Sequence, residues 1–170
     1  MSTPSPTLLL PIPQSYGRVL LAATGGLILN TFHSFSIGTY FRPRAGIILP
    51  QLYATPEQAA ANPNAYTYNC AQRAHANYVE NLFPTIGAML LGGLRYPGAV
   101  TCLGVAWMGW RLIYFYNYTR PANYSKSQRG EIVHGRPPMG RGTAVIFWLC
   151  QFALYGLAVR SSWEVYAMGL

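Results

Sequence analysis

The stretch Asn69-Cys-Ala-Gln-Arg-Ala-His-Ala-Asn-Tyr-Val-Glu-Asn81 decides the fold, because it places charged and amide side chains directly before a long apolar run. In a helix, Arg73, Asn77 and Glu80 stand at positions i, i+4 and i+7, so they share one face. The residues that follow, 82–94, carry no charge. The pattern predicts one helix whose polar face lies at the mouth of an apolar segment.

The composition indicates a membrane protein. Of the 170 residues, 51% are hydrophobic and only 9% are charged, whereas soluble domains average about 25% charged residues. The chain holds twelve basic and four acidic residues, but the basic residues stand singly between apolar runs. A nucleic-acid binder needs a contiguous basic face, so that class is excluded. Cys70, Cys102 and Cys150 are too few for a disulfide framework or a zinc site, and no metal site is expected.

Four apolar segments predict an all-α integral membrane protein with four transmembrane helices running up and down. The first has 23 residues without a charged side chain, enough to span a hydrocarbon core of about 30 Å. Asn30 and His33 make its second half amphipathic, so that half faces protein or a cavity. The expected helices are 19–41, 66–94, 99–118 and 142–160, which form one domain over 18–165 after an N-terminal lead of 1–17.

Local signals set the expected helix ends. The sequence Phe41-Arg-Pro-Arg44 ends the first helix, and Arg160 closes the last. Pro84 predicts a kink in the second helix. The short turn 95–98 makes the second and third helices antiparallel neighbours.

The distribution of basic residues predicts the orientation. The first and third loops with their flanks hold seven, against three on the opposite side, which favours cytosolic first and third loops. The seven are Arg42, Arg44, Arg120, Lys126, Arg129, Arg136 and Arg141, and the three are Arg18, Arg95 and Arg160.

A second polar face lies on the third helix, where Arg111, Tyr114 and Tyr118 stand at i, i+3 and i+7. Converging with the polar face of residues 73–80, it suits a small anionic or zwitterionic ligand, since arginines pair with carboxylates and a glutamate with an ammonium group. A structural interpretation stays open. It makes Arg73 and Glu80 a simple ion pair, Asn77 and His75 polar packing groups, and the tyrosines an aromatic belt.

Four motifs resemble the family of membrane-associated proteins in eicosanoid and glutathione metabolism, and within it most closely the type 3 microsomal glutathione S-transferases. The resemblance covers about residues 18–160. Its carriers are Leu49-Pro-Gln-Leu-Tyr53, Tyr68-Asn-Cys-Ala-Gln-Arg-Ala-His-Ala-Asn-Tyr-Val-Glu80, Leu94-Arg-Tyr-Pro97, and the stretch from Gly104 through Arg111-Leu-Ile-Tyr-Phe-Tyr-Asn-Tyr118.

The resemblance implies a homotrimer in the endoplasmic reticulum or the mitochondrial outer membrane, with glutathione bound between neighbouring subunits on the cytosolic side. It also implies that a thiol-activating arginine lies at the start of the last helix. Two candidates precede a glycine: Arg129 fits a local Lys-x-x-Arg-Gly pattern, and Arg141, which directly precedes the last helix, is preferred. The implied glutathione-binding residues are Arg42, Arg44, Pro50, Arg73, His75, Asn77, Glu80, Arg111, Tyr114 and Tyr118.

The implied function is a membrane-bound glutathione transferase with possible peroxidase activity. Glutathione, activated as a thiolate, attacks a lipophilic electrophile or reduces a lipid hydroperoxide, and membrane lipid is the other partner. The alternative is a non-catalytic lipid-binding scaffold of the same family. The retention of Arg73, Asn77 and Glu80 favours the enzyme.

Overall fold

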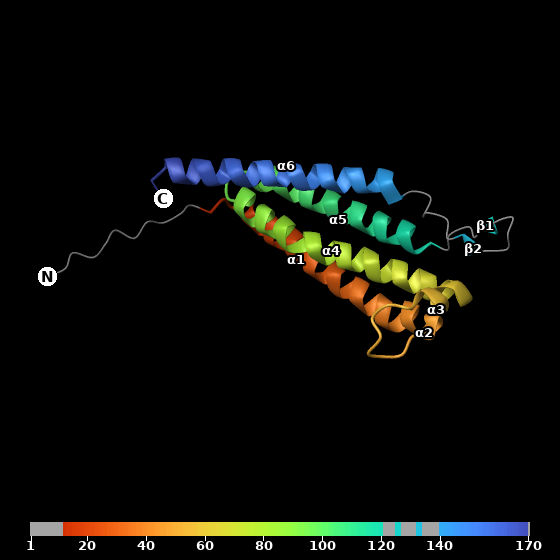
Figure 1. Cartoon of the computed structure of the whole chain (residues 1–170). Helices are drawn as coiled ribbons and strands as arrows, with labels where there is room; N and C mark the ends of the chain where they lie inside the picture. Colours follow the sequence, from red (N-terminus) through yellow and green to blue (C-terminus); the bar gives the residue numbers. More distant parts are fainter. Residues whose placement is uncertain (1–11, 121–124, 127–131, 134–139, 170) are drawn as a thin grey trace.

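A computed structural model describes residues 12–120, 125–126, 132–133 and 140–169, with side chains over 12–120 and 145–169 (Figure 1). Long helices dominate this part of the chain, as the sequence predicted. The elements are α1 (Tyr16–Ser36), the π-helical turn η1 (Ile37–Phe41), α2 (Arg42–Ala45), α3 (Pro56–Ala61), α4 (Pro63–Gly93), α5 (Pro97–Thr119), β1 (Ser125–Lys126), β2 (Ile132–Val133) and α6 (Gly140–Ala167).

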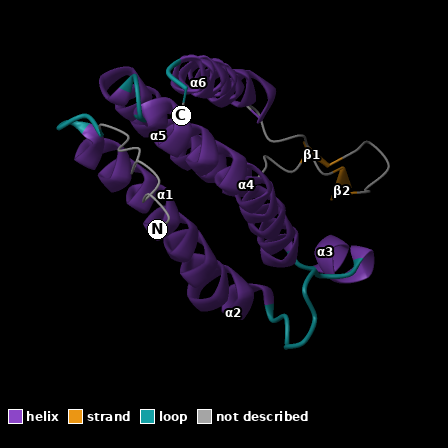
Figure 2. Cartoon of the chain, turned by 90° about the vertical axis from the view of Figure 1, so that its left-hand side faces the viewer, coloured by secondary structure: helices purple, strands orange, loops and turns teal. Residues whose placement is uncertain are grey.

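The four long helices run alternately up and down and pack along their lengths (Figure 1). α4 contacts α1, α5 and α6, and α1 also packs on α5 (Figure 2). The short helices α2 and α3 lie at the end where α4 begins and α5 finishes (Figure 1). In the stretch predicted to be a loop, β1 and β2 form one short antiparallel pair, with Ser125 opposite Val133 and Lys126 opposite Ile132.

Within the described ranges, three helical segments are long and apolar enough to cross a membrane: Tyr16–Ala45, Pro97–Thr119 and Val145–Ala167. Large apolar side chains cover the outside of the first, where Leu21 is 75% exposed and Phe35 66% exposed. α4 does not reach the same apolarity, because its first half carries the polar stretch 69–81. Its 31 residues nevertheless give it a length of about 46 Å at 1.5 Å per residue.

The first helix runs further than the sequence predicted. It begins at Tyr16, and the Arg-Pro-Arg sequence does not end it, since η1 and α2 continue the helical path to Ala45. Pro43 lies in the first turn of α2, directly after the π-helical turn η1, where the regular α-helical hydrogen-bond pattern is interrupted and a residue without a backbone N–H is tolerated. Gly46 ends α2 with a φ of 68°, a left-handed conformation that glycine adopts without strain.

The last helix also passes its predicted end. Arg160 does not close α6, because Arg160 Nε donates to a carboxylate oxygen of Glu164 one turn further on, at 3.1 Å, and the helix continues to Ala167. Arg95 Nε donates to the other carboxylate oxygen of Glu164 at 3.2 Å, and the Tyr96 hydroxyl also bonds to this carboxylate. Glu164 therefore ties α6 to the α4–α5 turn.

The first loop is partly helical. Thr55 and Gln58 form a capping box at the start of α3, in which each side chain bonds to the backbone N–H of the other residue. Pro84 lies inside α4, which is continuous from Pro63 to Gly93. The kink at this proline stays a prediction.

Glycines allow the helices to approach closely at the end of α4. A Cβ added to Gly93 would lie 2.9 Å from both γ-carbons of Val19 on α1, and one added to Gly92 would lie 3.3 Å from the backbone nitrogen of Ala158 on α6. Small residues at such positions are typical of helix packing in membranes. By contrast, nothing lies within 4 Å of a Cβ added to Gly87 in the same helix.

We therefore expect Gly93→Ala to destabilise the protein by about 2 kcal/mol, because the branched Val19 side chain has to move. The matched control, Gly87→Ala, should be neutral or stabilise the protein by up to about 1 kcal/mol, since alanine is the better helix former. Unfolding by increasing dodecyl sulfate in mixed micelles, followed by circular dichroism, measures both. Equal stability of the two variants would contradict the packing described.

Candidate functional site

A buried arginine fixes the centre of the candidate site. Arg111 on α5 is 1% exposed; its Nη1 donates to Oδ1 of Asn77 on α4, and its Nη2 donates to the Asn77 carbonyl oxygen, both at 2.7 Å. Its guanidinium carbon lies 4.1 Å from the ring centroid of Phe147 and 5.1 Å from that of Trp107. Aromatic faces and one amide therefore stabilise this cation. Among the described residues, Arg111 forms no salt bridge with a carboxylate.

Further amides continue this polar cluster into the apolar half of the bundle. Asn81 Nδ2 donates to the Asn77 carbonyl oxygen at 2.8 Å, and Gln151 Nε2 on α6 donates to Oδ1 of Asn81 at 3.2 Å. The indole N–H of Trp107 donates to Oε1 of Gln151 at 3.2 Å. The sequence interpretation did not assign Asn81 and Gln151 to the site. The signal that points to them is an amide side chain inside an otherwise apolar segment.

Arg73 and Glu80 lie on the outer face of α4. Arg73 Nη1 and Glu80 Oε1 are 3.2 Å apart, and the two side chains are 57% and 54% exposed. This contact confirms that Arg73 and Glu80 share one face of the helix, as their i, i+7 spacing predicted. It also confirms the ion pair that the sequence left open as a purely structural role for these two residues. An exposed ion pair contributes only about 0–1 kcal/mol, so a ligand can separate these charges at little cost.

The tyrosines of α5 adjoin this ion pair. Tyr114 and Tyr118 lie with their ring centroids 5.2 Å apart, and Arg73 lies within electrostatic range of both side chains. The structure therefore brings together six of the predicted residues, from two helices. They are Arg73, Asn77 and Glu80 of α4 and Arg111, Tyr114 and Tyr118 of α5.

Four predicted residues make their contacts elsewhere in the chain. His75 Nε2 is 3.1 Å from Oδ1 of Asn30, which confirms that the polar half of α1 faces protein. Arg42 Nη1 donates to the carbonyl oxygen of Gln51 at 2.8 Å, and Arg44 stacks on the ring of Tyr40. Pro50 is exposed in the first loop. Within one chain, these residues do not contact Arg73 or Glu80.

The two candidate thiol-activating arginines are not described at the level of side chains. Arg129 lies outside the described residues. Arg141 lies in the first turn of α6, which begins at Gly140, and its side chain is outside the described part of the chain.

His33 is a buried polar residue at the junction of α1, α4 and α5. It is 1% exposed, stacks on Phe115 with ring centroids 4.2 Å apart, and meets the ring of Tyr78 edge-on at 5.1 Å. Within the described part of the chain, neither of its ring nitrogens has a hydrogen-bond partner.

The dependence of Arg111 on Asn77 gives a direct prediction. Asn77→Ala leaves the buried guanidinium without its side-chain acceptor, and the free energy of unfolding should fall by about 2–3 kcal/mol. Asn64→Ala, at an exposed asparagine of the same helix, is the matched control and should change stability by less than about 0.5 kcal/mol. Thermal unfolding in detergent compares the two variants, and an unchanged midpoint for Asn77→Ala would refute the role assigned to this bond.

A comparison with known protein families agrees with this arrangement. The MAPEG family model matches residues 19–160, which include all four long helices in large part and every residue of the Arg73–Glu80 and Arg111–Tyr118 clusters. The family includes glutathione transferases, glutathione peroxidases and eicosanoid synthases. With its apolar helices and this match over most of its length, the chain belongs to the MAPEG family of membrane proteins.

Proposed function

We propose that this protein is a membrane-bound glutathione transferase that conjugates lipophilic electrophiles or reduces lipid hydroperoxides. The observation that carries the proposal is the accessible Arg73–Glu80 pair beside Tyr114 and Tyr118, in a member of a family with glutathione-dependent enzymes. The buried hydrogen bond between Arg111 and Asn77 holds this part of α4 against α5.

The residues fit the charges of glutathione, which has two carboxylates and one ammonium group. Arg73 offers a forked set of donors to a carboxylate, and Glu80 offers acceptors to the ammonium. Binding would replace one weak surface ion pair with two charge-assisted contacts that are shielded from water. We assign the hydroxyls of Tyr114 and Tyr118 to hydrogen bonds with the peptide amides of glutathione.

The proposal includes a homotrimer in which a neighbouring subunit completes each site. Support comes from the exposure of Arg73 and Glu80, which leaves room for a partner. It also comes from Arg42, Arg44 and His75, whose contacts in one chain lie elsewhere, and from Pro50, which is exposed in the first loop. It also includes α4 as a fourth membrane span and cytosolic first and third loops, in the endoplasmic reticulum or the mitochondrial outer membrane. The stretch of α4 after Glu80, which carries no charge, and the packing of α4 on three helices support that span.

The reaction requires a thiolate, because a free thiol with a pKa of about 8.5 is mostly protonated at neutral pH. A guanidinium about 4 Å from the sulfur contributes about 4 kcal/mol at an effective dielectric constant of about 20, before desolvation. That exceeds the amount needed to lower the thiol pKa by about two units, at about 1.4 kcal/mol each. We assign this role to Arg141, with Arg129 as the alternative. The thiolate then forms a bond to an electrophilic carbon, and the electron pair goes to the leaving group or to the conjugated double bond that breaks. With a lipid hydroperoxide it attacks a peroxide oxygen, the O–O bond breaks, the alkoxide leaves and is protonated to the alcohol, and the glutathione sulfenic acid reacts with a second glutathione to give the disulfide and water.

The ultraviolet absorbance of thiolate on adding glutathione tests this mechanism. The purified wild-type protein should show the signal, and Arg141→Ala should lower it at least about tenfold, the effect of removing about 1.4 kcal/mol of stabilisation. If Arg129 is the activating residue, Arg129→Ala shows the loss instead. Lys126→Ala, which removes a basic residue of the same loop, is the control and should keep the signal.

Two outcomes would contradict the proposal in different ways. A full thiolate signal in the Arg129→Ala/Arg141→Ala double variant would refute the assigned mechanism. Complete absence of glutathione binding to the wild-type protein, measured by calorimetry, would instead favour the non-catalytic lipid-binding scaffold.

A further inference from the structure

The hydrogen bond between Arg111 and Asn77 determines which end of the Asn77 carboxamide stays free. A guanidinium has five N–H donors and no acceptor, so it bonds to the amide oxygen and never to the amide nitrogen. Arg111 Nη1 accordingly donates to Oδ1 of Asn77 at 2.7 Å. The NH2 group of Asn77, which carries two donors, is therefore directed away from the guanidinium.

This NH2 group is available to a ligand. Asn77 is half-buried, and within the described part of the chain its Nδ2 atom has no hydrogen-bond partner, whereas its backbone carbonyl oxygen accepts from both Arg111 and Asn81. Asn77 lies about one turn from Arg73 and about one turn from Glu80, between the two partners of the exposed ion pair. A ligand that separates this pair therefore meets a hydrogen-bond donor between the two charges.

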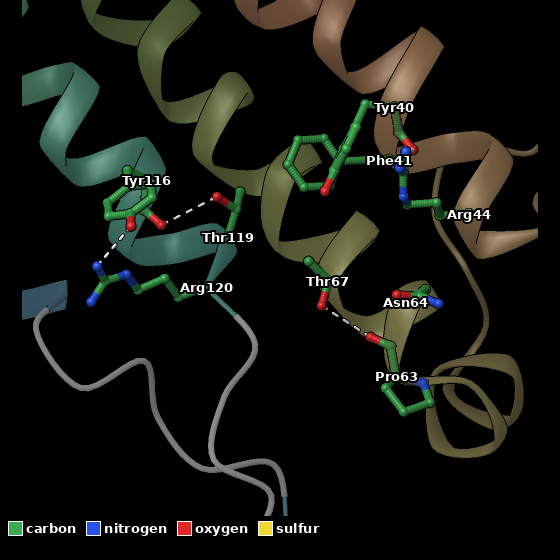
Figure 3. A pocket seen from close by; sticks show the side chains of 9 residues that line it. All are labelled: Tyr40, Phe41, Arg44, Pro63, Asn64, Thr67, Tyr116, Thr119 and Arg120. Carbon is green, nitrogen blue, oxygen red and sulfur yellow. Dashed lines mark hydrogen bonds between the residues drawn. The ribbon is translucent and has the colours of Figure 1, made fainter.

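Arg111 itself does not reach such a ligand. Its side chain is 1% exposed, and the rings of Trp107 and Phe147 lie against its guanidinium. The arginines at the end of the bundle are different, since Arg44 and Arg120 line an open pocket of about 580 Å³ (Figure 3). Those two can contact a solute directly, whereas Arg111 acts on a ligand only through the residue that it holds or through its charge.

A purely structural bond would not require a cation. One turn further along α4, Asn81 accepts from Gln151 of α6 at 3.2 Å, so two neutral amides suffice to link neighbouring helices. A buried guanidinium has a larger desolvation cost than an amide, and no carboxylate among the described residues forms a salt bridge with it. What the cation adds is direction, because a neutral amide or hydroxyl can bond to either end of Asn77 while a guanidinium bonds only to its oxygen.

We propose that Arg111 is a positioning residue for ligand recognition, which makes Asn77 a hydrogen-bond donor to an oxygen atom of glutathione. The inference rests on the proposed function, since the ligand is the glutathione of that site. The acceptor is a carboxylate or peptide carbonyl oxygen, and the bond adds to the charge contacts of Arg73 and Glu80. The oxygen end of Asn77, in contrast, is directed at Arg111 and away from the ligand.

Asn77→Asp separates this role from a structural one. Aspartate keeps an oxygen for Arg111 and gives the buried cation a carboxylate, but it replaces the free NH2 group by an acceptor. The full-length variant in neutral-detergent micelles should therefore unfold at the wild-type temperature or above it. Its Kd for glutathione, measured by calorimetric titration, should nevertheless rise at least about tenfold, the loss of about 1.4 kcal/mol. Ser162→Asp, which adds the same charge at the opposite end of the bundle, should change neither value.

A double-mutant cycle tests whether Arg111 acts through Asn77 or through its own charge. Arg111→Met lets the amide rotate, so that it presents its donor for only part of the time, and glutathione affinity should fall about twofold or more. In the Asn77→Ala background, Arg111→Met should cause no further loss of affinity. This double variant should also fold, since it removes both partners of the buried bond and leaves neither unpaired.

The possible failures are distinct. No binding of glutathione to the wild-type protein would refute the proposed function and this inference with it. Binding to the wild-type protein with unchanged affinity in Asn77→Asp would overturn this inference alone. A lower unfolding temperature of Asn77→Asp would also overturn it, because the loss of binding would then reflect loss of structure. Additive losses in the double-mutant cycle would overturn the positioning role, since Arg111 would then act by its charge.

Discussion

The buried cation of Arg111 is the constraint on which the rest of the site depends. A guanidinium that is 1% exposed requires partners inside the bundle, and here they are one asparagine of α4 and the faces of surrounding aromatic rings. Because Asn77 is bonded through both its side chain and its carbonyl oxygen, the rotation of α4 relative to α5 is fixed at this level. That rotation decides which polar residues of α4 are buried and which are exposed.

With this rotation, the polar face of α4 has two functions. Asn77 and Asn81 enter a hydrogen-bonded network that reaches Gln151 on α6 and holds three helices together. Arg73 and Glu80, one turn to either side of Asn77, remain about half exposed and bond to each other. The buried network thus provides rigidity, while the outer pair keeps its charges accessible. A binding site needs this combination of a fixed support and available charges.

Much of this arrangement was predictable from spacing. Long apolar runs indicated the long helices, and the i, i+4, i+7 and i, i+3, i+7 patterns indicated both polar faces. Spacing along one helix does not show which neighbour covers each face, so it did not show that His75 bonds to Asn30 on α1 or that Arg44 stacks on Tyr40. The end of α6 was missed because the pairing of Arg160 with Glu164 prolongs the helix beyond its apolar residues. The choice between Arg129 and Arg141 rests on sequence alone.

The central claim is that Arg73 and Glu80 bind glutathione rather than simply stabilise the fold. The charge-reversed double variant Arg73→Glu/Glu80→Arg tests it most directly, because this variant rebuilds the ion pair with the two charges exchanged. Calorimetric titration with glutathione, with thermal unfolding as a check, gives the result. The exchanged variant should keep near wild-type stability and show no measurable glutathione binding, because each of its charges then repels the group of glutathione that it would have to bind. Loss of binding in the two single variants with full recovery in the exchanged one would contradict the account and make the pair purely structural.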